Sequence, residues 1–307
     1  MNYLFIIDPI DSLALYKDTT IILMKECLRQ KINVFYSTIN EISIDSKINI
    51  KVECQQLQAI NESITSSSKI KNNIEYFNKI FIRKDPPFDI SYLNLTYILD
   101  HIESNDIKIF NNPSSIRSHN EKLSILQFKD LIPPSLVSSS FSATKEFISK
   151  YKKVILKPLD GMAGNGIFMV TSEDKNLNVI LETMMGNFHH PIMAQKFIPE
   201  ISNGDTRIIL INGEPLPYGL TRIPKPGEIR ANLAKGGSGI IRSINKNDEI
   251  IINKIKPYLL EKNLNFVGID VIGSYLTEIN ITSPTGLVEI QNQSNINYAE
   301  VVINALQ

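Results

Sequence analysis

The sequence predicts an α/β fold with a parallel sheet in its N-terminal part, followed by an α+β part built on antiparallel strands. Strand-like and helix-like segments alternate up to about residue 110, which favours parallel strands covered by helices. A glycine-rich connection between two apolar strands then begins a different pattern, in which most strands follow one another directly. The 307 residues are enough for two or three lobes around a large buried core.

Short apolar runs define the N-terminal elements. We expect strands at residues 3–7, 33–36, 79–82 and 107–110, and helices that begin near Asp18 and span residues 90–102. Asp18 suits the N-cap position, because its carboxylate can accept hydrogen bonds from the first backbone N–H groups of a helix. The first apolar run stops at Asp8-Pro9, so we interpret it as a buried strand and expect no signal or membrane segment. Residues 41–78 are polar and predict no particular element.

The rest of the chain predicts two further groups of elements. The first group is expected to hold strands 153–157, 166–170 and 192–195, with a helix at 176–185. The second is expected to hold strands 207–211, 214–221, 265–272 and 276–281, with a helix at 246–260. Residues 223–239 contain two prolines and four glycines and show no periodicity, which is typical of a functional loop.

The balance of charges argues against some classes of function. Lys plus Arg and Asp plus Glu both number 32, so the formal net charge is zero, whereas a nucleic-acid binder usually carries a basic excess. Cys27 and Cys54 are too few for a disulfide framework or a four-cysteine zinc site. We therefore expect a protein of a reducing, cytoplasmic compartment, with no nucleic-acid or membrane partner.

A lysine beside a glycine-rich loop predicts a phosphate site. Lys157 ends the apolar run VILKP, and Gly161, Gly164 and Gly166 follow it closely. Such a loop offers phosphate oxygens one cation and several free backbone N–H groups. The spacing is neither the Walker pattern nor the dinucleotide fingerprint, and a strand follows the loop, so the phosphates would lie under a hairpin flap. A β-hairpin with a mobile turn and an exposed lysine is the other interpretation.

Three oxygen-bearing side chains near the C-terminal end predict a magnesium site. Glu278 and Asn280 lie two residues apart on one expected strand and share a face, and Mg²⁺ prefers such oxygen ligands. Asp270 joins them only if the hairpin has a longer turn or a bulge, since a two-residue turn would pair it with Thr277. A polar hairpin face that meets water is the alternative. Acids among Ile, Val and Phe favour the metal.

Arg207, Arg222 and Arg230 form a basic series in the last third of the chain. Arginine binds carboxylates and phosphates through two parallel hydrogen bonds and can stabilise charge on a transferring phosphoryl group. Three solvated surface arginines would be the ordinary interpretation of the same pattern. Lys122 has a weaker case of its own, because Glu121-Lys122 could open an exposed helix.

Five segments together resemble one family, the bacterial glutathione synthetases of the ATP-grasp superfamily. They are RKDPPFD from residue 83, NEKL from residue 120, ILKPLDGMAG, GEPLPYGLTRIP and TEINITSPTG. The resemblance runs in one order from Asp8-Pro9 to about Gln291. It implies an ATP-grasp fold preceded by a parallel-sheet domain. The domains would be residues 1–120, a small flap subdomain at 121–200, and a catalytic subdomain at 201–307 whose lid is the loop 223–239.

The resemblance also implies roles for individual residues. ATP would be held by two lysines, the flap glycines and an adenine and ribose edge, namely Lys122, Lys157, Gly161, Gly164, Gly166, Gln195, Phe197, Ile198 and Asp205. Two magnesium ions, or manganese in their place, would be bound by Asp270, Glu278 and Asn280. The phosphoryl group and the peptide would face Arg207, Arg222, Arg230 and Asn232. The substrates' carboxylates would lie near Ser283, Thr285 and Gly286.

The activity implied is the ATP-dependent ligation of γ-glutamylcysteine with glycine through an acyl phosphate, by a homotetramer. One departure from the family is Val288, where an arginine or glutamine is frequent. Another ATP-grasp ligase would keep Lys157 and the metal set but would not need RKDPPFD. A non-catalytic ATP-binding module is the alternative of another class, and the presence of both Glu278 and Asn280 argues against it.

Overall fold

The first part of the chain forms an eight-stranded mixed sheet. This computed structural model describes residues 1–102, 104, 106–161, 164–186, 190–225, 227–228, 230–231 and 238–307. The parallel strands are β1 (Asn2–Ile6), β2 (Asn33–Ser37), β7 (Lys79–Ile82) and β8 (Lys108–Phe110). Antiparallel strands join them at one side, namely β3 (Ile42–Ile44), β4 (Ile50–Ile60), β5 (Ile64–Ser66) and β6 (Ile70–Asn73).

The antiparallel strands extend the expected parallel sheet, whose four strands the structure confirms. They arise from the polar segment that predicted no element, because β4 alternates buried apolar residues such as Val52 and Cys54 with exposed polar ones. Helices α1 (Thr19–Arg29), α2 (Ile90–Leu99) and α3 (Pro113–Ser118) accompany this sheet. Short 3₁₀ segments are η1 (Ile10–Ser12), η2 (Ile39–Glu41), η3 (Ile74–Tyr76), η4 (Ser124–Gln127) and η5 (Pro199–Asn203).

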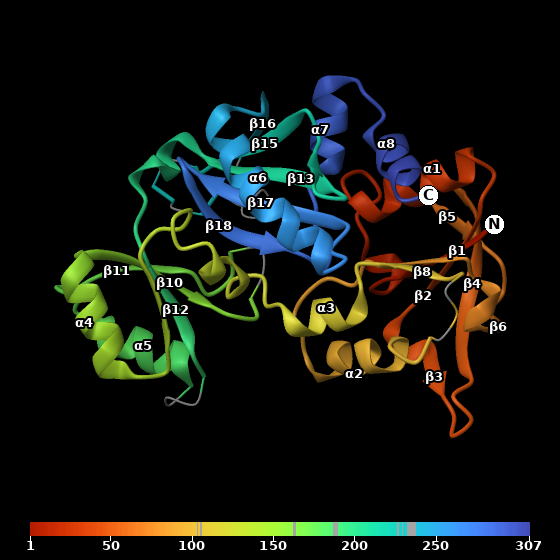
Figure 1. Cartoon of the computed structure of the whole chain (residues 1–307), viewed down its shortest axis with the longest axis horizontal. Helices are drawn as coiled ribbons and strands as arrows, with labels where there is room; N and C mark the ends of the chain where they lie inside the picture. The colour runs from red at the N-terminus through yellow and green to blue at the C-terminus, as the bar shows by residue number, and fades with distance from the viewer. Residues whose placement is uncertain are drawn as a thin grey trace.

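A four-stranded antiparallel sheet with two helices forms a lobe at the opposite end of the molecule (Figure 1). Its strands are β9 (Ser135–Ser138), β10 (Lys153–Pro158), β11 (Phe168–Thr171) and β12 (Ile192–Lys196), in the order β11-β10-β12-β9. Its helices are α4 (Phe141–Tyr151) and α5 (Leu177–Met185). The strand predicted at 166–170 begins two residues later, because Gly166 has a φ of 68° and belongs to the turn.

The third sheet lies between the other two (Figure 1). It consists of β13 (Asp205–Ile211), β14 (Glu214–Pro215), β15 (Tyr218–Ile223), β16 (Ser238–Ser243), β17 (Phe266–Ile272) and β18 (Tyr275–Asn280). Helices α6 (Lys246–Glu261), α7 (Leu287–Ser294) and α8 (Tyr298–Ala305) complete the chain. The predicted loop 223–239 is shorter than expected, since Ile223 ends β15 and pairs with Ser238 of β16. Residues 226, 229 and 232–237 of that loop lie outside the described part.

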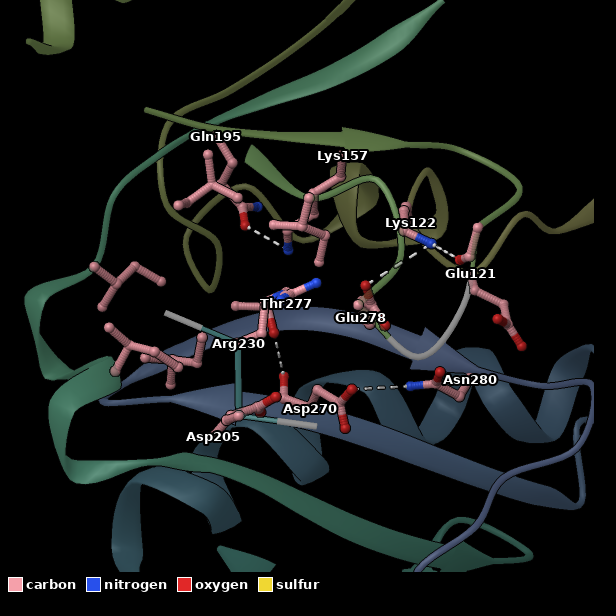
Figure 2. Close-up of a pocket in the computed structure, with 18 of the residues that line it drawn as sticks. Glu121, Lys122, Lys157, Gln195, Asp205, Arg230, Asp270, Thr277, Glu278 and Asn280 are labelled. Carbon is pink, nitrogen blue, oxygen red and sulfur yellow. Dashed lines mark hydrogen bonds and ion pairs between the residues drawn. The ribbon is translucent and has the colours of Figure 1, made fainter. Parts of the chain in front are cut away.

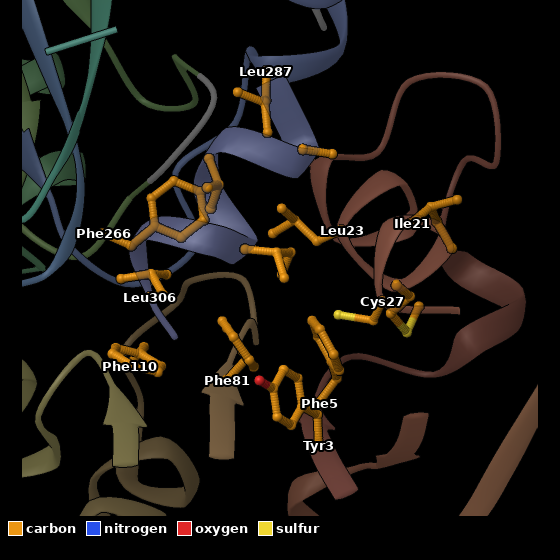
Figure 3. Packing of buried hydrophobic residues seen from close by; sticks show 14 of the residues in the cluster. Tyr3, Phe5, Ile21, Leu23, Cys27, Phe81, Phe110, Phe266, Leu287 and Leu306 are labelled. Carbon is orange, nitrogen blue, oxygen red and sulfur yellow. The ribbon is translucent and has the colours of Figure 1, made fainter. Parts of the chain in front are cut away.

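The C-terminal helices return to the N-terminal sheet and share its core (Figure 3). Phe5 stacks on Phe81 at 4.7 Å between ring centroids, and the same buried cluster includes Phe266, Leu287 and Leu306. Since these residues come from opposite ends of the chain, the cluster fixes the N-terminal sheet against the central one. Both termini lie at this end of the molecule (Figure 1). Within the described residues, no helix is both long and apolar enough to cross a bilayer.

Asp18 caps α1 as predicted. Its Oδ1 accepts hydrogen bonds from the backbone nitrogens of Thr20 at 2.7 Å and Ile21 at 3.4 Å. We expect Asp18→Ala to lower the free energy of unfolding by about 1 kcal/mol, because two N–H groups in the first turn lose their acceptor. Urea denaturation checks this, with the nearby exposed Asp11→Ala as the control. Equal urea midpoints for the two variants would show that the Asp18 cap does not stabilise the fold.

Candidate active site

A cavity opens between the four-stranded lobe and the central sheet (Figure 2). Lys157 of β10 and Gln195 of β12 line it from the lobe. Asp270 of β17 and Glu278 and Asn280 of β18 line it from the central sheet. Segments more than 70 residues apart in sequence thus place cations and oxygen-bearing side chains opposite one another.

Lys157 is buried at the end of β10, with 8% of its surface exposed. Its Nζ donates a hydrogen bond of 3.1 Å to Oε1 of Gln195, and Gln195 donates in turn to Ser135 at 3.1 Å. Burial lowers the pKa of Lys157, although the negative charge of Glu278 opposes the shift. The lysine is therefore not the exposed side chain of the alternative interpretation. A buried cation that lacks a paired acid is suited to receive an anionic ligand.

The glycine loop is held against the central sheet by Lys122. Lys122 is buried, and its Nζ donates to the carbonyl of Gly161 at 2.6 Å and lies 3.9 Å from Oε1 of Glu278. Gly161 and Gly164 line the cavity, and Gly166 packs behind them against the ring of Pro158. The expected alternative of an exposed helix at Lys122 is wrong, because residues 121–123 form a turn ahead of η4.

The β17–β18 hairpin resolves the register question through a bulge. Asp270 pairs with Glu278, but the register shifts after Asp270, so that Val271 pairs with Leu276 and Ile272 with Tyr275. The turn itself has only two residues, and Gly273 adopts the positive φ of 60° that it requires. Thr277, the extra residue of the bulge, donates from Oγ1 to the carbonyl of Asp270 at 3.1 Å. Asp270 therefore lies directly opposite Glu278, as one of the two predicted alternatives required.

Two buried arginines surround Asp270. Arg207 donates from Nε to Oδ1 at 2.5 Å and from Nη2 to Oδ2 at 3.0 Å, and Arg222 lies 3.1 Å from Oδ1. Burial alone would raise the pKa of Asp270, but Arg207 and Arg222 outweigh burial and hold it well below its ordinary value. These two residues are not solvated surface arginines.

Arg222 also pairs with Asp205 of β13. Its Nη2 donates to Oδ2 of Asp205 at 2.5 Å, across the strand pair in which the two residues are directly opposite. Burial raises the pKa of Asp205 to about 6, although Arg222 opposes the shift. Two polar atoms of the pair, Oδ1 of Asp205 and Nε of Arg222, are buried and have no hydrogen-bond partner among the described residues. Unpaired buried groups of this kind are expected where a ligand completes the site.

Asp270, Glu278 and Asn280 present the hard oxygen donors that a divalent cation needs. Glu278 is partly exposed to the cavity, and Asn280 Nδ2 donates to the carbonyl of Gly268 at 3.0 Å. That hydrogen bond orients the amide so that its oxygen stays available. The described residues contain no group of three or more His, Cys, Asp or Glu placed to bind a metal without help. This donor set therefore fits an ion that takes most of its remaining ligands from phosphates and water.

The remaining predicted residues divide between the cavity and its surroundings. Phe197, Ile198 and Arg230 line the cavity. Ser283, Thr285 and Gly286 are not among its lining residues, and they follow β18 on the far side of Arg207, which donates to the carbonyl of Thr285 at 3.3 Å. Asn232 lies outside the described residues.

Glu121 and Thr277 line the cavity but were not predicted. Oε1 of Glu121 accepts hydrogen bonds from the backbone nitrogens of Ile281 and Thr282 and from the hydroxyl of Thr282, at 2.9, 3.1 and 2.8 Å. Its position beside Lys122 in NEKL was the only signal in the sequence, and an adjacent charged pair is too common to predict a contact 160 residues away.

Two family models match nearly the whole chain. The model of the prokaryotic glutathione synthetase N-terminal domain matches residues 1–117, and that of the prokaryotic glutathione synthetase ATP-grasp domain matches residues 121–295. A glutathione synthetase of Neisseria meningitidis serogroup B is 39% identical over 100% of this chain and 98% of its own length. A glutathione synthetase of Coxiella burnetii is 41% identical over 98% and 95%.

Solved ATP-grasp ligases share the fold at much lower identity. A D-cycloserine synthetase has a TM-score of 0.70 and 10% identity over 99% of this chain and 100% of its own. A Chryseobacterium gregarium ATP-grasp ligase associated with a ribosomal peptide, in complex with ADP and a leader and core peptide, has a TM-score of 0.64 and 16% identity over 99% and 97%. The chain is an ATP-dependent ligase of the ATP-grasp fold, and it belongs to the prokaryotic glutathione synthetase family.

Proposed function

We propose that this enzyme joins the cysteinyl carboxylate of γ-glutamylcysteine to the amine of glycine, while ATP is converted to ADP and phosphate. The observation that supports this most is the cavity in which Lys122 and Lys157 face Asp270 and Glu278. The carboxylate attacks the γ-phosphorus and ADP leaves, which gives an acyl phosphate. The glycine amine then attacks the acyl carbon, loses a proton and expels phosphate.

Lys122 and Lys157 bind the phosphates of ATP in this proposal, with the glycine loop as a flap above them. Gln195, Phe197 and Ile198 form the edge for adenine, and Asp205 lies near the ribose. Asp270, Glu278 and Asn280 would hold Mg²⁺, which when bound would neutralise charge on the phosphates. The lowered pKa of Lys157 supports the role of that residue, because the negative charge of a bound phosphate replaces the stabilisation by water that burial has removed.

Arg207, Arg222 and Arg230 stabilise the charge on the transferring phosphoryl group and on the tetrahedral oxyanion. The buried Nε of Arg222 has no hydrogen-bond partner among the described residues, and Arg230 lies at the cavity wall in an ion pair of 2.5 Å with Glu228. Arg222, Arg230 and Asn232 also contact the peptide. Ser283, Thr285 and Gly286 bind a substrate carboxylate on the far side of Arg207. The segment 223–239 closes over the cavity and keeps water from the acyl phosphate.

The setting of the enzyme completes the proposal. Magnesium is the physiological ion and manganese can replace it. Cys27 and Cys54 are buried and unbridged, which supports a reducing cytoplasm. We further propose a homotetramer, from the resemblance of the chain to its family.

The reaction itself gives the first prediction for this site. ADP release is expected to require both γ-glutamylcysteine and glycine, with glutathione accumulating at the same rate. The measurement omits each substrate in turn and follows ADP and thiol products. Turnover with D-alanine alone, or with a protein C-terminus, would assign the chain to another ATP-grasp ligase.

The metal site predicts that Glu278→Gln lowers turnover by on the order of a hundredfold or more, because one charge that stabilises the transferring phosphoryl group is lost. The matched control is Glu214→Gln, the same substitution at an acid of the same sheet with 67% of its side chain exposed, and its turnover should stay at the wild-type value. Steady-state turnover over a range of Mg²⁺ concentrations checks both variants. Wild-type turnover in Glu278→Gln would refute the assignment.

The lid gives a prediction that separates ligation from nucleotide binding. Arg230→Ala is expected to slow ligation by on the order of a hundredfold, because an arginine that stabilises transition-state charge is lost. The dissociation constant of ADP should change little, since the proposed adenine contacts lie elsewhere. Lys225→Ala, an exposed position in the same segment, is the control.

ATP with the dipeptide should also protect residues 223–239 from limited proteolysis. Equal cleavage with and without ligands would show that the segment is no lid.

A further inference from the structure

The segment Arg83-Lys84-Asp85 begins RKDPPFD, one of the segments that resemble the family, but its residues do not line the cavity. It follows β7 at the carboxyl end of the parallel strands, beside the end of β1. The sheet continues from β1 to β2 on one side and to β7 on the other, so this point is a topological switch point, where open α/β sheets usually act on ligands. The segment faces residues 283–285, which follow β18.

Two consecutive residues of the loop 283–285 are held through their carbonyls by two different arginines. The carbonyl of Pro284 accepts from Nη2 of Arg83 at 2.9 Å. The carbonyl of Thr285 accepts from Nη1 of Arg207 at 3.3 Å. The N-terminal sheet thus holds one residue of this loop, and the catalytic sheet holds the next.

Arg83 lies where a rigid, planar cation can join helix α1 to the loop 283–285. Only 4% of its surface is exposed, and its guanidinium lies 5.1 Å from the centre of the Phe266 ring. Nε donates to Thr20 at 3.1 Å while Nη2 reaches Pro284, so one rigid plane spans α1 and the loop. Lysine lacks the planar fork, because its N–H donors all lie on one nitrogen, so it would not span the two acceptors in the same way.

The energetic balance at Arg83 argues against a role in stability alone. Its Nη1 is buried without a hydrogen-bond partner among the described residues, and burial lowers the pKa of the guanidinium. A buried charge that is only partly satisfied costs free energy, and an apolar side chain of the same size would often stabilise a fold more. What the guanidinium supplies in return is a fixed position for the carbonyl of Pro284.

We propose that Arg83 is a positioning residue for substrate binding. It fixes the carbonyl of Pro284, so that the backbone N–H groups of Thr285 and Gly286 are preorganised for a substrate carboxylate. This inference rests on the proposed function, which places the carboxylate of one amino-acid substrate at this loop. The loop also reaches Asp270 through Arg207, so its position is tied to the phosphate cavity.

The kinetic test uses Arg83→Lys and Arg83→Gln, which remove the planar guanidinium and keep approximate size. We expect KM for γ-glutamylcysteine or for glycine to rise about tenfold, as expected when one charge-assisted hydrogen bond is misplaced. KM for ATP should stay within about twofold, because the phosphate groups are untouched. The control is Arg117→Lys, another arginine of the N-terminal part, which pairs with Asp100 at 2.5 Å on the surface. Unchanged amino-acid KM values in both variants, or a rise in KM for ATP that follows a loss of Tm, would overturn the proposal.

Hydrogen exchange gives a second measurement that does not depend on turnover. The amide hydrogens of residues 282, 283, 285 and 286 should exchange faster in both variants than in the wild-type chain, whereas those of β17 should not change. If the wild-type enzyme does not ligate γ-glutamylcysteine to glycine, the proposed function is refuted. Hydrogen exchange in the loop would still test the positioning role in that case. Equal exchange in variant and wild-type loops would refute the positioning role even if the ligation is confirmed.

Discussion

The buried pairing of Arg207 and Arg222 with Asp270 and Asp205 is the interaction on which the rest of the site depends. Two guanidinium groups and two carboxylates lie together on β13, β15 and β17. Arg207, Arg222 and Asp270 are buried, and the side chain of Asp205 is 16% exposed. Their attraction in a medium of low dielectric constant offsets much of the cost of burial only while all four are present. Removing one partner of such a pair costs about 3–5 kcal/mol, because a buried charge is left alone. The network therefore fixes the three strands that carry the proposed site.

This network also explains how the cavity is prepared for a polyanion. Asp270 is already balanced by arginines, and among the described residues Glu278 is the acid that lies 3.9 Å from Lys122 and whose charge acts most strongly on Lys157. The folded protein already holds both lysines in their buried positions. Phosphates could therefore bind to them with little rearrangement of the site. A metal ion would add to this balance, since Glu278 and Asn280 are not engaged by the arginines.

Much of this arrangement is predictable from the sequence, and the exceptions share a physical cause. Alternating elements, the cap at Asp18 and the apolar strands around Lys157 follow from local patterns, and the structure confirms them. The bulge at Thr277 could be stated only as one of two alternatives, because the register is decided by contacts across the hairpin. In strand β4, polar residues on the exposed face hide the apolar alternation. Strand β16 has no buried residue, so it depends on its pairing with β15. Glu121 acts on residues 160 positions away, which no local pattern can reveal.

The position of the N-terminal sheet affects the proposed reaction as well as the fold. Its shared core with α7 and α8 holds the whole sheet, and Asn111 adds hydrogen bonds of 2.8 and 2.7 Å to the carbonyls of Phe266 and Ile281 at the ends of β17 and β18. Arg83 reaches Pro284 from the same sheet, and Arg207 holds the next residue from the catalytic side. A shift of the sheet would thus move the loop 283–285 relative to Asp270, even if the residues that line the phosphate cavity kept their positions. Catalysis tolerates such displacements poorly, because reacting groups must meet within a fraction of an ångström of their productive geometry. The N-terminal sheet is therefore coupled to the reaction by hydrogen bonds to backbone carbonyls, and this coupling does not require that the sheet contribute a group to the chemistry.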